Sequence, residues 1–142
     1  MNIAIFASGN GSNAQAIIRH FEHSTKVCIK CIITNNFKAG IINNAKSLAV
    51  PSFVFSKEDL NNDALLLDFL KQNNIEFIVL AGYLKKISSL LVSAFPKGIV
   101  NIHPALLPQF GGKGMHGMHV HEAVLKSGSK KTGRSEEHTS EL

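Results

Sequence analysis

The 142-residue sequence lacks several features that would narrow its class at once. It contains no tryptophan, one tyrosine and two cysteines, and every apolar run is far shorter than the roughly 20 residues that cross a membrane. The N-terminus has no basic start followed by an apolar stretch and a small-residue cleavage site, so a secretory signal is not predicted. We therefore expect a cytoplasmic protein without membrane association, built around one core.

The two cysteines, Cys28 and Cys31, have Cys-x-x-Cys spacing but do not indicate a metal or redox site. They lie within the apolar stretch 27–33, which is typical of a strand, and residues three apart on a strand point to opposite faces. Zinc needs further ligands, and a redox pair needs a helix N-terminus beside it. We expect two reduced, mostly buried thiols.

Acidic residues are scarcer than basic ones: 10 Asp and Glu stand against 15 Lys and Arg, for a net charge of +5. Glu136, Glu137 and Glu141 all lie in the last eight residues, so the rest of the chain is more basic still. The lysines are scattered, and no aromatic series or recognised nucleic-acid-binding motif accompanies them. The composition therefore favours a phosphorylated metabolite over a nucleic acid as the partner.

Strand and helix patterns alternate along the chain. Apolar runs predict strands at 2–7, 26–34, 52–55, 77–81 and 99–102. Helical spacing predicts helices at 14–21, 39–49, 88–95 and about 120–126, with one long helix that starts at a Ser56–Asp59 capping box and runs to Leu70. This alternation predicts a Rossmann-like, doubly wound α/β fold with a mainly parallel sheet and helices on both faces. The glycine-rich segment 109–117 is expected to be a mobile loop.

A glycine turn follows the first strand. Gly9-Asn10-Gly11-Ser12-Asn13-Ala14 fits the relaxed dinucleotide fingerprint, in which glycines let the backbone approach a ligand and the next helix offers N–H groups to an anion. A nicotinamide site also needs an acid or an arginine after the second strand, which instead ends Thr34-Asn35-Asn36. The turn therefore favours a terminal phosphate over a dinucleotide, and a tight turn with an ordinary helix cap stays an alternative.

A second group of polar residues lies at the end of the fifth predicted strand. Asn101 and His103 are two residues apart and share one side of an extended segment, and Pro104 cannot continue a central strand. Both side chains should emerge at the carboxyl edge, where open α/β sheets bind ligands. An amide donor beside an imidazole suits a developing oxyanion, as in acyl or formyl transfer, although a strand end before a proline turn has the same pattern.

Three segments together resemble the phosphoribosylglycinamide formyltransferase family, collinearly over residues 1–133. They are Ser8-Gly9-Asn10-Gly11-Ser12-Asn13, Val79-Leu80-Ala81-Gly82-Tyr83-Leu84 and Asn101 to Pro108. The resemblance implies transfer of a formyl group from 10-formyltetrahydrofolate to the amine of glycinamide ribonucleotide in de novo purine biosynthesis, with small-molecule partners and no metal, nucleic acid or membrane. The alternatives are a formyltetrahydrofolate hydrolase, a methionyl-tRNA formyltransferase or a non-catalytic module that binds a nucleotide or phosphate.

The resemblance also implies roles for individual residues. Asn101 and His103 would be catalytic, and His119 and His121 would contact the substrate. The residues expected to hold the substrate phosphate are Gly11, Ser12 and Asn13; those expected to bind folate are Leu84, Lys85, Lys86, Ile87 and Asn101. The family has an apolar residue where this chain has Lys86.

The histidines could also suggest a metal site. His116, His119 and His121 lie in or next to the glycine-rich loop, and Glu122 is the only nearby carboxylate. Their place on a glycine-rich loop, with no nearby Asp, favours helix entry or substrate contact over zinc.

The end of the sequence departs from the family. After the Thr-Gly that corresponds to Thr132-Gly133, the family continues with a strand, a loop whose Asp raises the protonated fraction of the catalytic histidine, and a helix. Residues 134–142 have one apolar residue and no strand pattern. We therefore expect an incomplete, C-terminally truncated formyltransferase α/β domain at 1–133 and a disordered non-family tail at 134–142. A bare fifth strand and impaired formyl transfer would follow. The sequence does not predict an oligomeric state.

Overall fold

The computed structural model describes residues 1–112, 114 and 118–138, with the side chains of 137 and 138 excepted. These residues form a six-stranded sheet of order β3-β2-β1-β4-β5-β6. The strands are β1 (Asn2–Phe6), β2 (Cys28–Thr34), β3 (Ser52–Val54), β4 (Phe77–Ala81), β5 (Ile99–His103) and β6 (Ser135–His138). All neighbouring pairs are parallel except β5 and β6. The predicted mainly parallel α/β sheet is confirmed.

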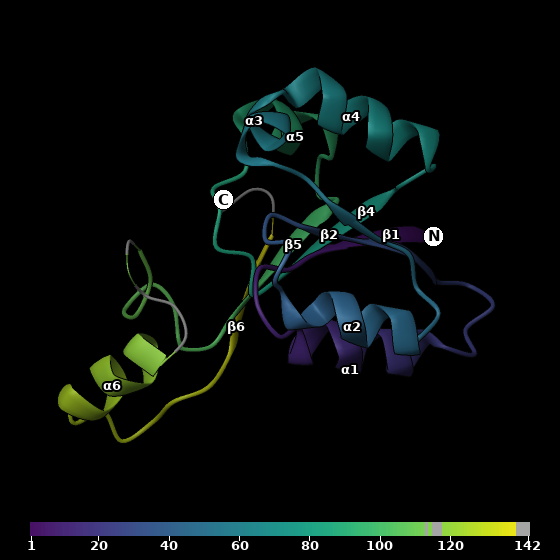
Figure 1. Ribbon diagram of the computed structural model, residues 1–142. Helices are drawn as coiled ribbons and strands as arrows, with labels where there is room; N and C mark the ends of the chain where they lie inside the picture. Colours follow the sequence, from purple (N-terminus) through teal and green to yellow (C-terminus); the bar gives the residue numbers. More distant parts are fainter. Residues whose placement is uncertain (113, 115–117, 139–142) are drawn as a thin grey trace.

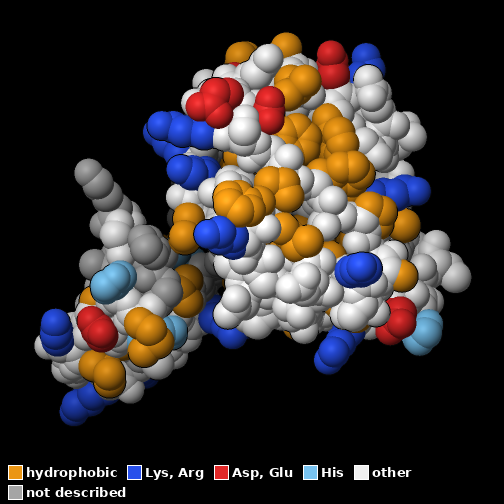
Figure 2. Space-filling view, viewed as in Figure 1, with side chains coloured by type: hydrophobic (Ala, Val, Ile, Leu, Met, Phe, Trp, Pro, Cys, Tyr) orange, Lys and Arg blue, Asp and Glu red, His pale blue; other side chains and the backbone are white. Residues whose placement is uncertain are grey.

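Helices cover both faces of the sheet (Figure 1). Those on one face are α1 (Ser12–Phe21) and α2 (Gly40–Ser47); those on the other are α3 (Lys57–Asn61), α4 (Asp63–Gln72) and α5 (Ser89–Ala94). In the space-filling view, Lys and Arg side chains are spread over the visible face rather than gathered into one patch (Figure 2). No helix in the described part of the chain is long and apolar enough to cross a membrane.

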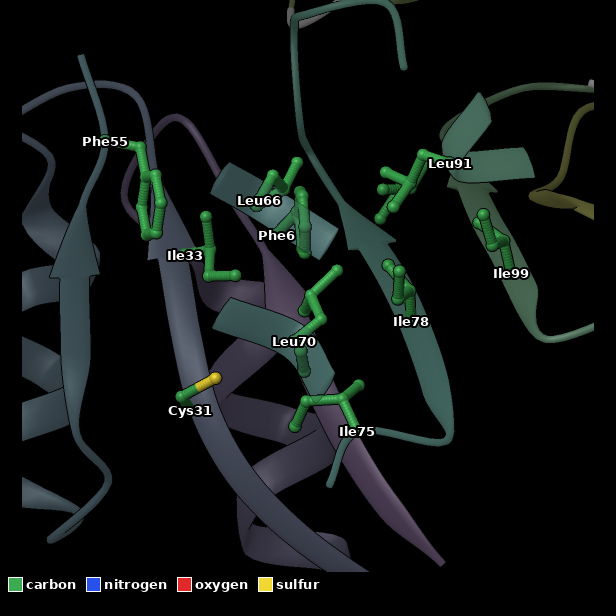
Figure 3. Packing of buried hydrophobic residues seen from close by; sticks show 12 residues of the cluster. Phe6, Cys31, Ile33, Phe55, Leu66, Leu70, Ile75, Ile78, Leu91 and Ile99 are labelled. Atoms are coloured by element: carbon green, nitrogen blue, oxygen red, sulfur yellow. The ribbon is translucent and has the colours of Figure 1, made fainter. Parts of the chain in front are cut away.

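The two covered faces explain why the central strands are apolar along their whole length. Alternate residues enter different cores: Phe6 packs with Ile33 and Leu70 beneath α3–α5 (Figure 3), whereas Ile5 packs with Ile41 beneath α1 and α2. All five side chains are fully buried. Because both faces are fixed in this way, the carboxyl ends of β1, β4 and β5 are held side by side at one edge.

The single helix predicted from Ser56 to Leu70 is wrong. The capping box forms as expected, since Ser56 Oγ accepts from the Asp59 N–H at 3.1 Å and Asp59 Oδ2 accepts from the Ser56 N–H at 3.0 Å. The helix stops at Asn62, whose φ of −94° and ψ of 87° are not helical. Asn62 Oδ1 accepts from the Leu65 N–H at 3.2 Å and caps α4 instead, because a short amide side chain competes with the helical backbone for N–H groups.

The prediction of two mostly buried thiols holds for only one of them. Cys31 is buried in the core under α4, and burial raises the pKa of its thiol to about 11. Cys28 is exposed at the start of β2. Only the second half of β2, from Cys31 to Thr34, is buried. The register of β2 against β1 also shifts between the two cysteines, passing from the Ile3–Ile29 pair to the Ala4–Cys31 pair.

The end of the described chain also differs from the prediction. Ser135–His138, expected to lie in a disordered tail, form β6 and pair antiparallel with β5, from His103–Ser135 to Val100–His138. The backbone N–H and C=O groups of an edge strand accept a partner whatever the side-chain pattern. The fifth strand is therefore not bare. Residues 139–142 lie outside the described chain, and the division at residue 133 stays a prediction.

Helix α6 (Met118–Lys126) lies beyond the carboxyl ends of the strands, apart from the helices that cover the sheet (Figure 1). It packs through Val120 and Val124 against Ala105 and Phe110 of the segment that follows β5. This small separate core fixes α6 to the segment that follows β5. The predicted mobile loop falls partly on residues 113 and 115–117, outside the described residues.

Candidate functional site

The glycine turn between β1 and α1 is held in an unusual conformation. Gly11 precedes α1 with φ of 72° and ψ of 32°, a left-handed conformation that favours glycine. A side chain there would lie 2.7 Å from Ile41 Cβ, so the turn packs directly on α2. Among the described residues, no side chain caps the start of α1, and Ser12 is exposed. This conformation is compatible with the close approach of an anion, and the phosphate-binding role of the turn stays a prediction.

Helix α2 anchors the turn through its backbone as well. The Ile41 N–H donates to the Gly9 carbonyl at 3.2 Å, and Asn44 Nδ2 donates to the Asn10 carbonyl at 2.9 Å. A side chain at Gly40 would meet Asn10 Oδ1 at 2.8 Å. Sequence patterns could not identify these contacts, because they join residues about 30 positions apart.

Asn13, a predicted phosphate-binding residue, is half-buried and accepts a hydrogen bond. Arg134 Nη1 donates to Asn13 Oδ1 at 3.0 Å. The chain just before β6 therefore reaches the start of α1, although the sequence assigned Arg134 to a disordered tail.

Ser8 connects the turn to two other loops, a role that the sequence pattern does not predict. Its side chain is 6% exposed, and its Oγ donates to Asn35 Oδ1 at 2.6 Å and accepts from the Leu84 N–H at 3.0 Å. Its backbone N–H donates to the Gly82 carbonyl at 3.1 Å. The one available signal was a hydroxyl residue directly after an apolar strand. Asn35 is thereby engaged at the position where a dinucleotide-binding protein would carry its ribose-binding acid.

The segment after β4 carries the predicted folate-binding residues. Lys85, Lys86 and Ile87 line a cavity of about 220 Å³, whereas Leu84 is not among its lining residues and is 57% exposed. The other residues around the cavity are Phe6, Lys57, Leu60, Asn61, Asp63, Leu66, Tyr83, Ser88 and Leu91. Apolar side chains thus form one part of the wall, and three lysines stand among the rest.

Tyr83 fixes the inner end of this segment. Its ring meets Phe6 edge-on, with 5.3 Å between centroids, and burial raises the pKa of its hydroxyl to about 12. Gly82, just before it, has a φ of 70° with no other atoms within 4 Å of the position of a Cβ, so the chain turns sharply as it leaves β4.

Asn101 and His103 both belong to β5 and are half-buried. Ile99, two residues earlier, lies in the core under α3–α5, and Asn101 pairs in register with Leu80 of the same core. Alternation along the strand therefore puts Asn101 and His103 on the sheet face that carries the cavity. His103 Nδ1 lies 3.4 Å from both the N and the O of Ala105, within the bend that ends the strand.

The two predicted substrate-contacting histidines lie on α6. His119 and His121 are exposed, and α6 stands at the carboxyl end of the sheet beyond β5 (Figure 1). In residues 1–112, 114 and 118–138, no group of three His, Cys, Asp or Glu side chains could hold a metal ion. His116 lies outside this described part.

A mainly parallel, doubly wound sheet with a glycine turn after its first strand and polar groups along one carboxyl edge defines an α/β protein of the class that binds ligands at this edge of the sheet. The chain belongs to the formyl transferase family, whose sequence profile matches residues 1–137. The predicted resemblance is thus confirmed, and the match runs four residues beyond the predicted boundary at 133.

Relatives of known name agree with this assignment. The chloroplastic phosphoribosylglycinamide formyltransferase of Arabidopsis thaliana is 43% identical over 137 residues, which are 92% of this chain and 47% of the relative. The Bacillus subtilis (strain 168) phosphoribosylglycinamide formyltransferase is 36% identical over 114 residues, 77% of this chain and 58% of the relative. The chain therefore spans about half the length of the curated relatives it matches.

Solved structures give the same result. The phosphoribosylglycinamide formyltransferase of Streptococcus pneumoniae TIGR4 superposes with a TM-score of 0.81 at 33% identity, covering 96% of this chain and 72% of that one. Glycinamide ribonucleotide transformylase 1 of Geobacillus kaustophilus gives a TM-score of 0.83 at 34% identity, with coverage of 95% and 72%.

Proposed function

We propose that this chain transfers a formyl group from 10-formyltetrahydrofolate to the amine of glycinamide ribonucleotide, a step of purine synthesis, in the cytoplasm. The observation that carries the proposal is the convergence of three features on neighbouring parallel strands. The glycine turn follows β1, the lysine-bearing cavity segment follows β4, and Asn101 and His103 end β5. A phosphate, a folate and a reacting carbonyl each have a matching feature at one sheet edge.

The substrate phosphate is assigned to Gly11, Ser12 and Asn13. The left-handed Gly11 and the uncapped start of α1 offer N–H groups and the positive end of the helix dipole to a dianion. Asn35 supports a monophosphate over a dinucleotide, because its amide oxygen is occupied by Ser8 and it carries no charge.

The folate is assigned to Leu84, Lys85, Lys86, Ile87 and Asn101. A folate combines flat rings with glutamate carboxylates, and the cavity combines an apolar wall of Phe6 and Leu66 with lysine ammonium groups at Lys85 and Lys86. Lys86 thus has a role in a charged subsite, even though the family has an apolar residue at this position.

The chemistry is assigned to Asn101 and His103. As the substrate amine attacks the formyl carbon, negative charge develops on the formyl oxygen; the bond from that carbon to N10 of the folate then breaks, and the proton lost by the amine passes to N10 of the departing tetrahydrofolate. The Asn101 amide and a protonated His103 would donate hydrogen bonds to that oxygen, and a preorganised donor of this kind is worth about 10²-fold to 10³-fold in rate. His119 and His121 would contact the substrate from α6. This scheme uses no metal and needs only small-molecule partners.

Calorimetric titration of this chain with glycinamide ribonucleotide, together with a formyl-transfer assay, tests the proposal. We expect saturable binding that fails for the dephosphorylated glycinamide riboside, and formylation of the amine that depends on both substrates. Release of formate without glycinamide ribonucleotide would instead indicate a hydrolase, and formylation of methionyl-tRNA a tRNA formyltransferase. Binding without formyl transfer would indicate a phosphate-binding module, and absence of binding would contradict the proposal.

A matched pair of variants tests the folate assignment. The double variant Lys85→Ala/Lys86→Ala should weaken binding of 10-formylfolate, a chemically stable relative of the proposed co-substrate, by about two- to fivefold, since exposed ion pairs contribute little each. Lys71→Ala removes the same kind of exposed charge from the end of α4, outside the cavity lining, and should leave binding unchanged. Equal effects in both proteins would contradict the assignment.

A further inference from the structure

We infer that Ser8 is a positioning residue that couples the phosphate turn to the folate segment, so that each ligand tightens the binding of the other. The inference rests on the proposed function for the identity of the two ligands. Its structural basis is one buried hydroxyl that joins the ends of three strands.

The hydroxyl of Ser8 both donates and accepts a hydrogen bond. A serine side chain has one O–H to donate, and here it goes to Asn35 Oδ1, at 2.6 Å, after β2. A lone pair accepts from the Leu84 N–H, at 3.0 Å, after β4. With the side chain 6% exposed, water cannot readily replace either bond. The orientation of the hydroxyl is therefore set by Asn35, and the oxygen in turn fixes Leu84.

The same residue begins the phosphate turn. Gly9 follows directly, and its carbonyl accepts from the Ile41 N–H at 3.2 Å. A displacement of the Leu84 segment must therefore either break the Ser8 bond or move the chain that leads into Gly11. When a ligand orders one of the two segments, this bond also restricts the motion of the other. The second ligand then loses less conformational entropy on binding, and the effect is the same whichever ligand binds first.

Four proteins test the inference: the unaltered chain, Ser8→Ala, Asn35→Asp and Thr34→Val. Asn35→Asp keeps an acceptor for the Ser8 hydroxyl. Thr34→Val removes a neighbouring hydroxyl that is fully buried and bonds to the Asn36 backbone, at 3.2 and 3.5 Å. It therefore controls for loss of a buried hydroxyl at this edge.

The first readout is the factor by which saturating glycinamide ribonucleotide tightens 10-formylfolate binding. We expect a factor above one in the unaltered chain, in Asn35→Asp and in Thr34→Val. In Ser8→Ala the factor should fall by about fivefold, or to one, because the substitution removes the Leu84 hydrogen bond that carries the coupling together with the Asn35 bond that orients the hydroxyl. We compare this ratio of folate affinities, measured with and without glycinamide ribonucleotide, because the new charge in Asn35→Asp changes the affinity for the phosphate by itself. A factor of one in the unaltered chain, or one that Ser8→Ala preserves, overturns the inference.

The second readout needs no ligand and is amide hydrogen exchange. In Ser8→Ala, the Ile41 N–H, whose acceptor is Gly9 and which the substitution does not touch, should exchange faster together with the Leu84 N–H. The Phe55 N–H, bonded to the Thr34 carbonyl at 2.9 Å, serves as the reference for general destabilisation. Faster exchange at Leu84 alone, or equally at Phe55, overturns the coupling. If the unaltered chain binds neither ligand, the proposed function fails, and this readout still decides whether Ser8 links the segments.

Discussion

Replacing Gly11 with alanine should destabilise the protein by about 2–5 kcal/mol, through two separable effects. The first is backbone conformation: Gly11 has a φ of 72°, and an L-residue there costs about 1–2 kcal/mol. The second is space: the new Cβ would lie 2.7 Å from Ile41 Cβ and Cγ1, and closer still to its Cδ1. Ile41 is fully buried, and overfilling a packed core costs about 1–3 kcal/mol.

Two other glycines separate these effects. Gly82 has a φ of 70° but open space around it, so Gly82→Ala should cost only the conformational part, about 1–2 kcal/mol. Gly9 lies in the same turn as Gly11, without a left-handed φ and with open space, so Gly9→Ala should change stability by less than about 0.5 kcal/mol.

The assay is urea unfolding followed by circular dichroism, with free energies compared across the three alanine variants. Ile41→Val removes the methyl group that the new Cβ would meet first. In the Gly11→Ala protein, Ile41→Val should therefore lower the free energy of unfolding by at least about 0.5 kcal/mol less than it does in the unaltered protein. If Gly11→Ala is no less stable than Gly82→Ala, or if the two substitutions are additive, the close packing of the turn on α2 is refuted.

Three further predictions concern the site and the fold. Asn101→Ala should lower formyl transfer by about 10²-fold to 10³-fold with little change in glycinamide ribonucleotide affinity by calorimetry, and equal losses in both would count against an oxyanion role. Burial raises the pKa of Cys31 to about 11 and that of Tyr83 to about 12, above their ordinary values of 9.0 and 10.0. The unfolded chain therefore loses these protons first, and stability should fall between about pH 9 and pH 12. Tyr83→Phe should flatten the fall of the urea midpoint above about pH 10, and an unchanged slope would contradict this origin. Ser56→Ala removes the helix cap and should cost about 1 kcal/mol in urea unfolding, whereas an unchanged midpoint would show that the cap contributes nothing.

The place of the candidate site in the fold was partly predictable, because its main features are local in sequence. The glycine turn, the Asn101–His103 pair and the Lys85–Lys86 segment each follow an apolar strand, and parallel strands bring such segments to one edge. Local patterns also located the strands and the capping box. They did not show that the helix ends at Asn62, because the choice between continuing a helix and capping a new one depends on the backbone that follows.

Apolar periodicity and turn chemistry thus determine, from the sequence alone, the alternating elements, the parallel sheet and the edge that carries the polar groups. Only the tertiary structure decides which groups meet there. Ser8 contacts Asn35 and Leu84 across 27 and 76 positions, the cavity combines α3 and α4 with the β4 segment, and β5 gains β6 as its neighbour. Such contacts depend on strand order and on the packing of whole elements, for which no local run of residues carries a signal.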